Sequence, residues 1–95
     1  MNEHDLQEQV LALCEGLGLL THHEPDSRRS NRGWPDLVII GTRVLYRELK
    51  SPIGTLSHDQ KVLGWKLKAA GQDWAVWWPK DLGNGNIERQ LKEIA

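Results

Sequence analysis

DLVIIGTRVLYRELK, residues 36–50, consists of two short β-type runs separated by Gly41 and Thr42. The first run is apolar and β-branched, as in a buried strand, while the second alternates, so that Glu48 and Lys50 leave the same face. A link this short is typical of a β-hairpin, which would bring Asp36 to the level of Glu48 on the neighbouring strand. We therefore expect a central hairpin that carries carboxylates and a lysine at one end.

The segments on either side of the hairpin predict further helices and strands. Apolar residues at helical spacing precede Gly16, and the segment from Ser57 to Gln60 has the pattern of a helical capping box. The polar, basic stretch PDSRRSNRG at 25–33 is typical of a loop. The expected elements are a helix Glu3–Leu17, strands Leu19–His23, Asp36–Gly41 and Arg43–Lys50, a helix from Ser57 to Ala70, a strand Asp73–Trp78, and a helix capped by Asn86 that runs to Ile94. This α-β-β-β-α-β-α order predicts an α/β fold with one mixed sheet flanked by helices.

Length and composition limit the class of protein. The chain has 95 residues, of which 39% are hydrophobic and 26% charged, and this fits a single small domain spanning residues 1–95. These values exclude a disordered or collagen-like chain. No apolar run reaches the roughly 20 residues that a membrane span needs, and no secretory leader opens the chain. Because Cys14 is also the only cysteine, we expect a cytoplasmic protein.

The formal net charge of −1 conceals an uneven distribution of charged residues. Residues 1–26 contain six acids and no Lys or Arg, whereas residues 27–50 contain six bases and two acids. The balanced total argues against a protein that coats nucleic acid by bulk charge. A basic band beside isolated acids instead suits a surface that binds phosphates and holds a metal ion, although an ordinary solvated surface can have the same composition.

The end of the expected hairpin has the residues that metal-assisted chemistry needs. Asp36 and Glu48 could share a hard divalent cation such as Mg²⁺, which takes oxygen ligands and keeps several waters. Lys50 beside them could orient or help deprotonate an attacking water and oppose developing phosphate charge. The alternative is a structural ion pair at a strand end, and spacing alone does not separate the two interpretations.

These residues and their neighbours resemble a known family. GWPD at residues 33–36, a gap of eleven residues and ELK at residues 48–50 resemble the signature of PD-(D/E)xK nucleases. The flanking sequence is similar to the VRR-NUC branch, the virus-type replication-repair nucleases, and especially to their small stand-alone phage and bacterial members. The matching segments are Glu3 and Gln7 at a helix start, SRRSNRGWPDLVI at 27–39, ELKS at 48–51, and Leu56, Ser57 and Gln60 at a second helix start.

The resemblance covers nearly the whole chain and implies both a fold and an activity. The fold would be the restriction-endonuclease-like α-β-β-β-α-β core. The activity would be that of a Mg²⁺- or Mn²⁺-dependent deoxyribonuclease, an endonuclease that hydrolyses DNA phosphodiester bonds. Small relatives of this kind are often homodimeric Holliday junction resolvases, which implies branched DNA as the partner and a role in DNA repair. The alternatives are a non-catalytic DNA-binding module of the same fold and a structural subunit.

The family motifs also imply a set of site residues. Those that match are the metal ligands Asp36, Glu48, the Leu49 carbonyl and Glu3, and the catalytic residues Asp36, Glu48, Lys50 and Gln60. The first-helix position stays open, because Gln7 and Glu8, about one turn after Glu3, are alternatives. Gln60 also has a structural interpretation, since it is the third helical residue after the Ser57 cap and could simply bond that backbone.

Other polar and aromatic residues are candidates for contacts with DNA. Arg28, Arg29 and Arg32 precede the motif on the polar loop, where guanidinium groups could clamp phosphates; the alternative is a solvated loop. Trp34 adjoins the motif and could stack a base or brace the site. His22 and His23 are expected at a strand end rather than in a zinc site, because the chain has no paired Cys or His spacing.

The tryptophans bear on assembly. Trp74 and Trp78 share one face of the expected strand and Trp77 lies on the other. Together they offer more aromatic surface than a small core readily uses, and aromatic residues are enriched at interfaces. We therefore expect a homodimer that prefers four-way junctions, the alternative being a monomer with internal tryptophans.

Overall fold

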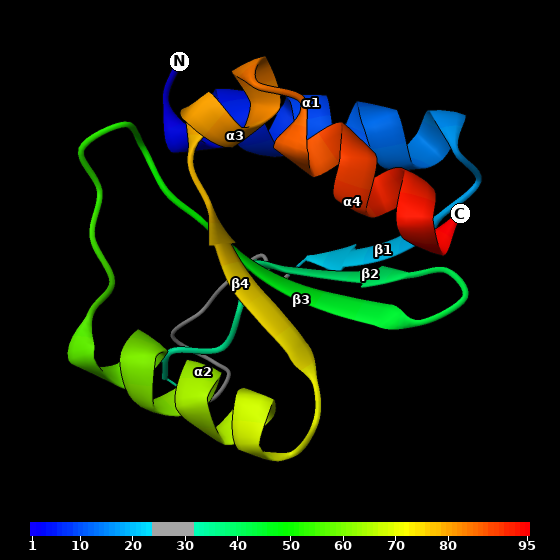
Figure 1. The fold of residues 1–95 in the computed structure, drawn as a ribbon. Helices are drawn as coiled ribbons and strands as arrows, with labels where there is room; N and C mark the ends of the chain where they lie inside the picture. The colour runs from blue at the N-terminus through cyan, green and yellow to red at the C-terminus, as the bar shows by residue number, and fades with distance from the viewer. Residues whose placement is uncertain (24–31) are drawn as a thin grey trace.

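The computed structural model describes residues 1–23 and 32–95, and it centres on a four-stranded sheet (Figure 1). The strands lie in the order β1 (Leu20–His23), β2 (Leu37–Ile40), β3 (Val44–Leu49) and β4 (Asp73–Trp77). β1 and β2 are antiparallel, as are β2 and β3, whereas β4 is parallel to β3. The expected mixed α/β fold and its central hairpin are confirmed.

Helices cover both faces of the sheet (Figure 1). α1 (Glu3–Gly16), α3 (Pro79–Gly83) and α4 (Asn86–Ile94) lie over one face, and α2 (His58–Ala69) lies on the other side, against β4. The connection from β3 to β4 contains α2, as a crossover between parallel strands requires. Within residues 1–23 and 32–95, no helix has the length and apolar character needed to cross a lipid bilayer.

The hydrophobic core lies between the sheet and the layer formed by α1 and α4. Buried side chains recur every fourth position on α1, at Leu6, Val10 and Cys14, and every second position on β2, at Leu37 and Ile39. These are the periods with which a helix and a strand turn one face inward. The other core residues are Leu19, Leu45, Leu49, Trp77, Ile87, Leu91 and Ile94.

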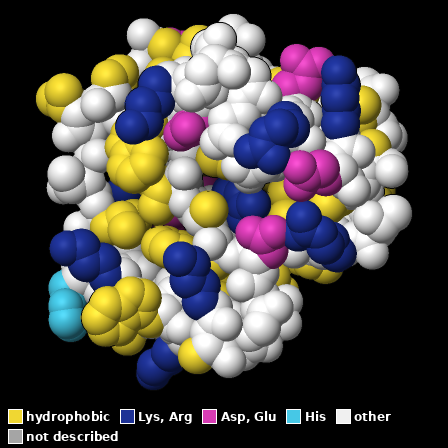
Figure 2. Space-filling model, viewed as in Figure 1, with side chains coloured by type: hydrophobic (Ala, Val, Ile, Leu, Met, Phe, Trp, Pro, Cys, Tyr) yellow, Lys and Arg dark blue, Asp and Glu magenta, His cyan; other side chains and the backbone are white. Residues whose placement is uncertain are grey.

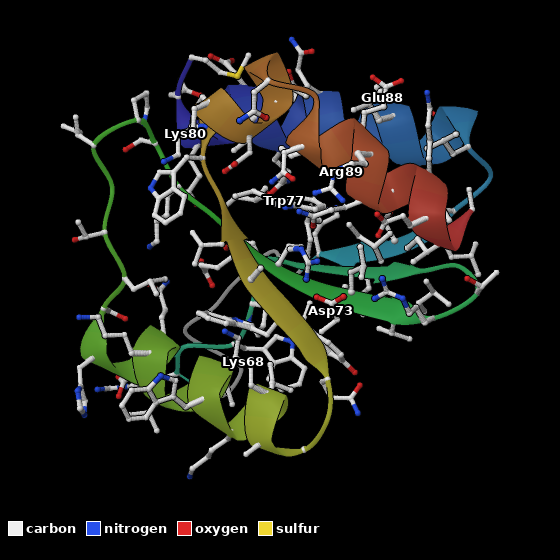
Figure 3. All side chains as sticks on the ribbon, viewed as in Figure 1. Lys68, Asp73, Trp77, Lys80, Glu88 and Arg89 are labelled. Carbon is white, nitrogen blue, oxygen red and sulfur yellow. The ribbon has the colours of Figure 1, made fainter. Side chains whose placement is uncertain are left out.

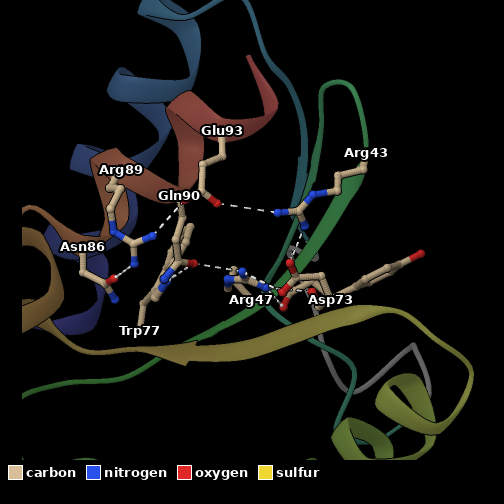
Figure 4. Close-up of polar contacts among 9 residues, drawn as sticks. Arg43, Arg47, Asp73, Trp77, Asn86, Arg89, Gln90 and Glu93 are labelled. Atoms are coloured by element: carbon tan, nitrogen blue, oxygen red, sulfur yellow. Dashed lines mark hydrogen bonds and ion pairs between the residues drawn. The ribbon is translucent and has the colours of Figure 1, made fainter.

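A polar network is buried beside this core (Figure 4). Arg47 is 2% exposed, and its guanidinium donates to the Gln90 side-chain oxygen at 2.9 Å and to the Asp73 backbone carbonyl at 2.7 Å. It also pairs with the Asp73 carboxylate at 2.9 Å and lies 5.0 Å from the centre of the Trp77 ring. The network therefore ties β3, β4 and α4 together.

The C-terminal half differs from the sequence-based expectation in two places. Pro79–Gly83 form the short helix α3, which the expected element order does not contain. Pro79 suits the first helical position, and the Asp81 carboxylate accepts a hydrogen bond from the Trp78 N–H at 2.8 Å. The residue that caps α4 is Gly85, at φ +80°, so the expected Asn86 cap is wrong and Asn86 is the first residue of the helix.

The tryptophans are mostly internal. Trp74 is 9% exposed and Trp77 is 1% exposed, and they lie on opposite faces of β4 as expected. The expectation that these two provide interface surface is wrong, because the chain buries both. Trp78 is half-buried and donates its indole N–H to the Gly54 carbonyl at 3.0 Å. The tryptophan that lies open to solvent is Trp65, which is 75% exposed.

Candidate active site

An open pocket of about 530 Å³ lies where β3 ends and β2 begins, between the first turns of α1 and α2. Its lining is strongly polar and contains most of the residues that the motif singled out. The lining residues are Glu3, Arg32, Gly33, Trp34, Asp36, Glu48, Lys50, Ser57, Asp59 and Gln60. Four separate segments of the chain therefore meet at this point.

Asp36 is positioned by the register of the hairpin. Leu37 pairs with Arg47 across the β2–β3 ladder, which puts Asp36 level with Glu48, as the sequence predicts. The Asp36 carboxylate accepts a hydrogen bond from the Leu49 N–H at 2.8 Å. This bond fixes one carboxylate oxygen against β3 and leaves the carboxylate at the pocket wall.

Glu48 is a buried acid, only 2% exposed. One carboxylate oxygen, Oε1, accepts a hydrogen bond from the Gln60 amide at 3.1 Å, while the other, Oε2, is buried and receives a hydrogen bond from no donor group. A hydrogen bond between Glu48 and the Asp36 carboxyl therefore needs a proton on one of the two acids. Burial, a hydrogen bond with Asp36 and the negative charge of Asp36 raise the pKa of Glu48 to about 10, against the opposing charge of Lys50. A buried acceptor left in this state is costly unless a cation or a donor satisfies it.

Gln60 connects the two candidate catalytic groups. Its side-chain oxygen accepts hydrogen bonds from the Lys50 ammonium and from the Ser57 N–H, each at 2.9 Å, while its amide group donates to Glu48. The Ser57 hydroxyl accepts from the Gln60 N–H at 3.2 Å, which completes the capping box. Gln60 thus closes the helix cap and also contacts Lys50 and Glu48 in the pocket, while its catalytic role stays a prediction.

Glu3 is the first-helix acid that reaches the pocket. Burial and the charge of Asp36 raise the pKa of Glu3, and the charge of Lys50 opposes them. The alternatives lie elsewhere: Gln7 is half-buried and Glu8 is exposed, with its carboxylate 3.1 Å from the His4 ring. Of the three candidates, only Glu3 lines the pocket.

Asp36 and Glu48 are the side chains of the pocket that could bind a divalent cation. Among residues 1–23 and 32–95, no three or more His, Cys, Asp or Glu side chains are arranged to hold a metal ion. Mg²⁺ needs less than that, because it is commonly bound by one or two carboxylates and completes its shell with water. The adjacent carboxyl groups of Asp36 and Glu48 supply such a pair, so the residues present fit Mg²⁺ or Mn²⁺.

The GWPD turn packs directly against the first turn of α2. Gly33 has φ +82°, and a Cβ at this position would overlap the backbone carbonyl of Asp59. Pro35 is fully buried, and the Trp34 ring meets the Tyr46 ring edge-on, with centroids 6.3 Å apart. The turn therefore holds the Asp36 side of the pocket against the Gln60 side.

Of the other residues considered in the sequence, only some lie at the pocket. Arg32 is exposed at the pocket rim, whereas Arg28 and Arg29 lie outside the described residues. His22 and His23 are exposed on β1 and are not among the residues that line the pocket. Two further lining residues, Asp59 and Gly33, were not predicted as site residues. Gly33 could have been found, because it is the first residue of the GWPD segment.

Comparisons of the chain with protein-family models, with curated proteins and with solved structures found no match. The likeness to VRR-NUC nucleases therefore stays an expectation from the motifs.

Proposed function

We propose that the protein is a metal-dependent DNA endonuclease that hydrolyses phosphodiester bonds at this pocket. The observation that carries the proposal is the pair of adjacent acids Glu48 and Asp36, in which the buried Oε2 of Glu48 receives a hydrogen bond from no donor group and the two carboxyls can bond each other only by sharing a proton. A structural ion pair at a strand end would not leave that oxygen unsatisfied. A divalent cation would satisfy it and would favour the ionised carboxylate.

The residues that would hold the cation are Asp36 and Glu48, with the Leu49 backbone carbonyl as a further oxygen donor. Glu3, the third expected ligand, lines the pocket but does not form a three-acid group with them. When bound, Mg²⁺ or Mn²⁺ polarises a phosphoryl oxygen and lowers the pKa of a coordinated water. The hydrogen bond from the Leu49 N–H orients the Asp36 carboxylate, and the Gln60 amide orients that of Glu48. These bonds fix the acids before substrate arrives.

Lys50 supplies the positive charge of the site. Its ammonium donates a hydrogen bond to the Gln60 side-chain oxygen at 2.9 Å, and this neutral acceptor leaves the positive charge of Lys50 unpaired with a negative charge. The two remaining N–H groups are available for an attacking water or for a phosphate oxygen on which negative charge develops. Arg32 at the rim could neutralise a neighbouring phosphate.

Selectivity for branched DNA, as in a Holliday junction resolvase, is the finer part of the proposal. It is supported by the motif resemblance and by Trp34 at the pocket wall, since an aromatic ring can stack on a base that is not held in a duplex. The biological setting would then be DNA repair or recombination.

The test is cleavage of labelled linear and branched DNAs with Mg²⁺, Mn²⁺, Ca²⁺ or EDTA. We expect products with Mg²⁺ or Mn²⁺, none with EDTA, and binding without efficient cleavage with the larger Ca²⁺. Asp36→Ala, Glu48→Ala and Lys50→Ala should each lower the cleavage rate about 100-fold or more. Glu15→Ala, which removes an exposed carboxylate at the other end of α1, should leave the rate unchanged.

The outcomes separate the alternatives. Equal cleavage in EDTA and Mg²⁺, or full activity in two of the three site variants, would overturn the assigned site. DNA binding without divalent-dependent cleavage would identify a non-catalytic DNA-binding module, and absence of DNA binding would favour a structural subunit.

A further inference from the structure

Trp65 is an unusual residue on the surface of this small protein. It is 75% exposed, while Trp74 and Trp77 are almost completely buried. It lies in the middle of α2, where the opposite side of the helix faces the sheet and its Gly64 is buried. An indole is the largest apolar side chain, and leaving it in water forgoes the burial that stabilises the others. Its exposure therefore suggests a ligand rather than a role in the core.

Positive charges surround Trp65 on the same helix face. Lys61 and Lys68, four residues before and three after it, are its neighbours in helical spacing, and Lys66 and His58 are also exposed. Figure 2 shows hydrophobic surface over α2 bordered by Lys or Arg side chains and a histidine. The one acid of this helix, Asp59, instead lines the pocket at its first turn.

The helix is fixed in place, so this face is preorganised. A Cβ on Gly64 would come within 2.5 Å of the Trp74 indole, which shows how closely α2 packs on β4. The Lys68 ammonium lies 5.7 Å from the centre of the Trp74 ring, so its charge is held at the flank of the helix (Figure 3). Trp65 lies five residues after Gln60, which is about 7.5 Å along the helix axis and about 140° around it, so Trp65 leaves a different side of α2 from the side that lines the pocket.

We propose that this face of α2, defined by Trp65 with Lys61 and Lys68, binds DNA, and that Trp65 stacks on an unpaired base. A flat ring among cations matches a nucleotide, which offers a π face and a phosphate together. Bases inside a duplex already stack on each other, so the free face belongs to a strand end, gap or branch. The proposal rests on the proposed nuclease function only for the choice of DNA over other polyanions.

The test is binding in EDTA, where no cleavage is expected, of a labelled single-stranded oligonucleotide and its duplex, followed by fluorescence anisotropy at several salt concentrations. Trp65→Ala should weaken single-strand binding about tenfold without changing the salt slope, and Trp65→Tyr should restore most of the affinity. Lys61→Ala should lower the slope of log K against log salt by about 0.7.

Two control variants remove the same kinds of side chain at other exposed positions. Leu20→Ala removes another apolar side chain, 69% exposed, and Lys92→Ala removes a lysine whose side chain is 61% exposed on α4. Both should bind single strands as the wild type does. Unchanged single-strand affinity in Trp65→Ala, or an equal loss for duplex and single strand, would overturn the stacking role.

Other occupants give different results and would also overturn the proposal. If Trp65→Ala lost binding to anionic lipid vesicles and kept DNA binding, the face would be a membrane contact. If the wild type were a dimer and Trp65→Ala a monomer, the face would bind a second copy. Mg²⁺-dependent cleavage measured in parallel separates the two ideas: Trp65-dependent binding without any cleavage would support this surface and contradict the nuclease.

Discussion

Gln60 shows how one side chain can serve both the fold and the site. Its side-chain oxygen closes the capping box by accepting from the Ser57 N–H, and the same oxygen holds the Lys50 ammonium. Its amide donates to the buried Glu48 carboxylate. A neutral amide suits this position, because it can accept from a cation and donate to an acid at the same time.

This double role makes Gln60→Ala informative. The variant should lose about 1 kcal/mol of helix-cap stability and lower the cleavage rate about 10-fold to 100-fold, because Lys50 and Glu48 lose their shared partner. Asp5→Ala is the matched control: Asp5 closes the capping box of α1, where Asn2 N–H donates to its carboxylate at 3.1 Å, and it does not line the pocket. Both variants should melt at similar temperatures, while only Gln60→Ala should cleave slowly. Equal cleavage rates in the two would show that Gln60 is only a cap.

Asp73 is the residue whose ionisation links stability to pH. Burial raises its pKa, but the hydrogen bond and charge of Arg43 and Arg47 outweigh burial, so the pKa of Asp73 lies below its ordinary value. A carboxylate with a lowered pKa stabilises the folded state above its unfolded pKa of about 3.9, and that contribution is lost as pH falls through the folded pKa.

Asp73→Asn should therefore be destabilised at neutral pH, by about 2 kcal/mol after allowance for the partial exposure of Asp73, because the buried Arg47 loses its charged partner. The difference from the wild type should shrink as pH falls below about 4. Urea unfolding at pH 7 and pH 3 measures this. Glu93→Gln, at an exposed acid that pairs with Arg89, should change stability by less than about 0.5 kcal/mol at either pH. A constant difference for Asp73→Asn across this range would contradict the assignment.

At the level of elements, the site depends on how the GWPD turn meets α2. Gly33→Ala should disturb that contact in two ways, because the residue has positive φ and its Cβ would overlap the Asp59 carbonyl. Gly71 offers a matched control, since it has the same φ of +82° but no atom within 4 Å of a Cβ. Both substitutions should cost about 1–2 kcal/mol through the backbone conformation.

Only Gly33→Ala should also move the Asp36 and Gln60 sides of the pocket apart, and we expect its cleavage rate to fall at least about tenfold, as small misplacements of catalytic groups commonly do. Cleavage assays at a temperature well below both unfolding midpoints make the comparison. Similar rates for Gly33→Ala and Gly71→Ala would mean that the close approach of the turn to α2 does not position the site.

The helices and strands also show which features of the fold and the site can be predicted from the sequence. The β2–β3 hairpin and the α2 cap are local sequence patterns. They were therefore enough to predict that Asp36 and Glu48 lie side by side and that Gln60 begins a helix. The burial of Glu48 could not be predicted in the same way, since it depends on the packing of four segments. The burial of Arg47 has the same cause, because its partner Gln90 lies 43 residues away in the chain. α3 is too short for helical periodicity to predict, and its signal was the Pro79 and Asp81 pair at its start.

At the scale of the whole molecule, size limits what one chain can do to DNA. The chain measures 32 × 29 × 23 Å, which is about the length of one turn of B-DNA. The proposed site is the pocket at the end of the sheet where β3 ends and β2 begins, so one chain would act on one strand at a time. Symmetric cleavage of a branched substrate would need two such sites in fixed relation.

We therefore expect the protein to be a homodimer that cleaves four-way junctions in preference to linear duplex. Two-fold symmetry is the commonest way to present two identical sites, and a four-way junction has matching symmetry. Because Trp74 and Trp77 are buried inside the chain, the interface has to use other surface. Light scattering at micromolar concentration should give twice 10.8 kDa, and mixing wild type with Asp36→Ala should yield junctions nicked in one strand. A 10.8 kDa species with and without DNA, or equal rates on junction and duplex, would contradict the prediction.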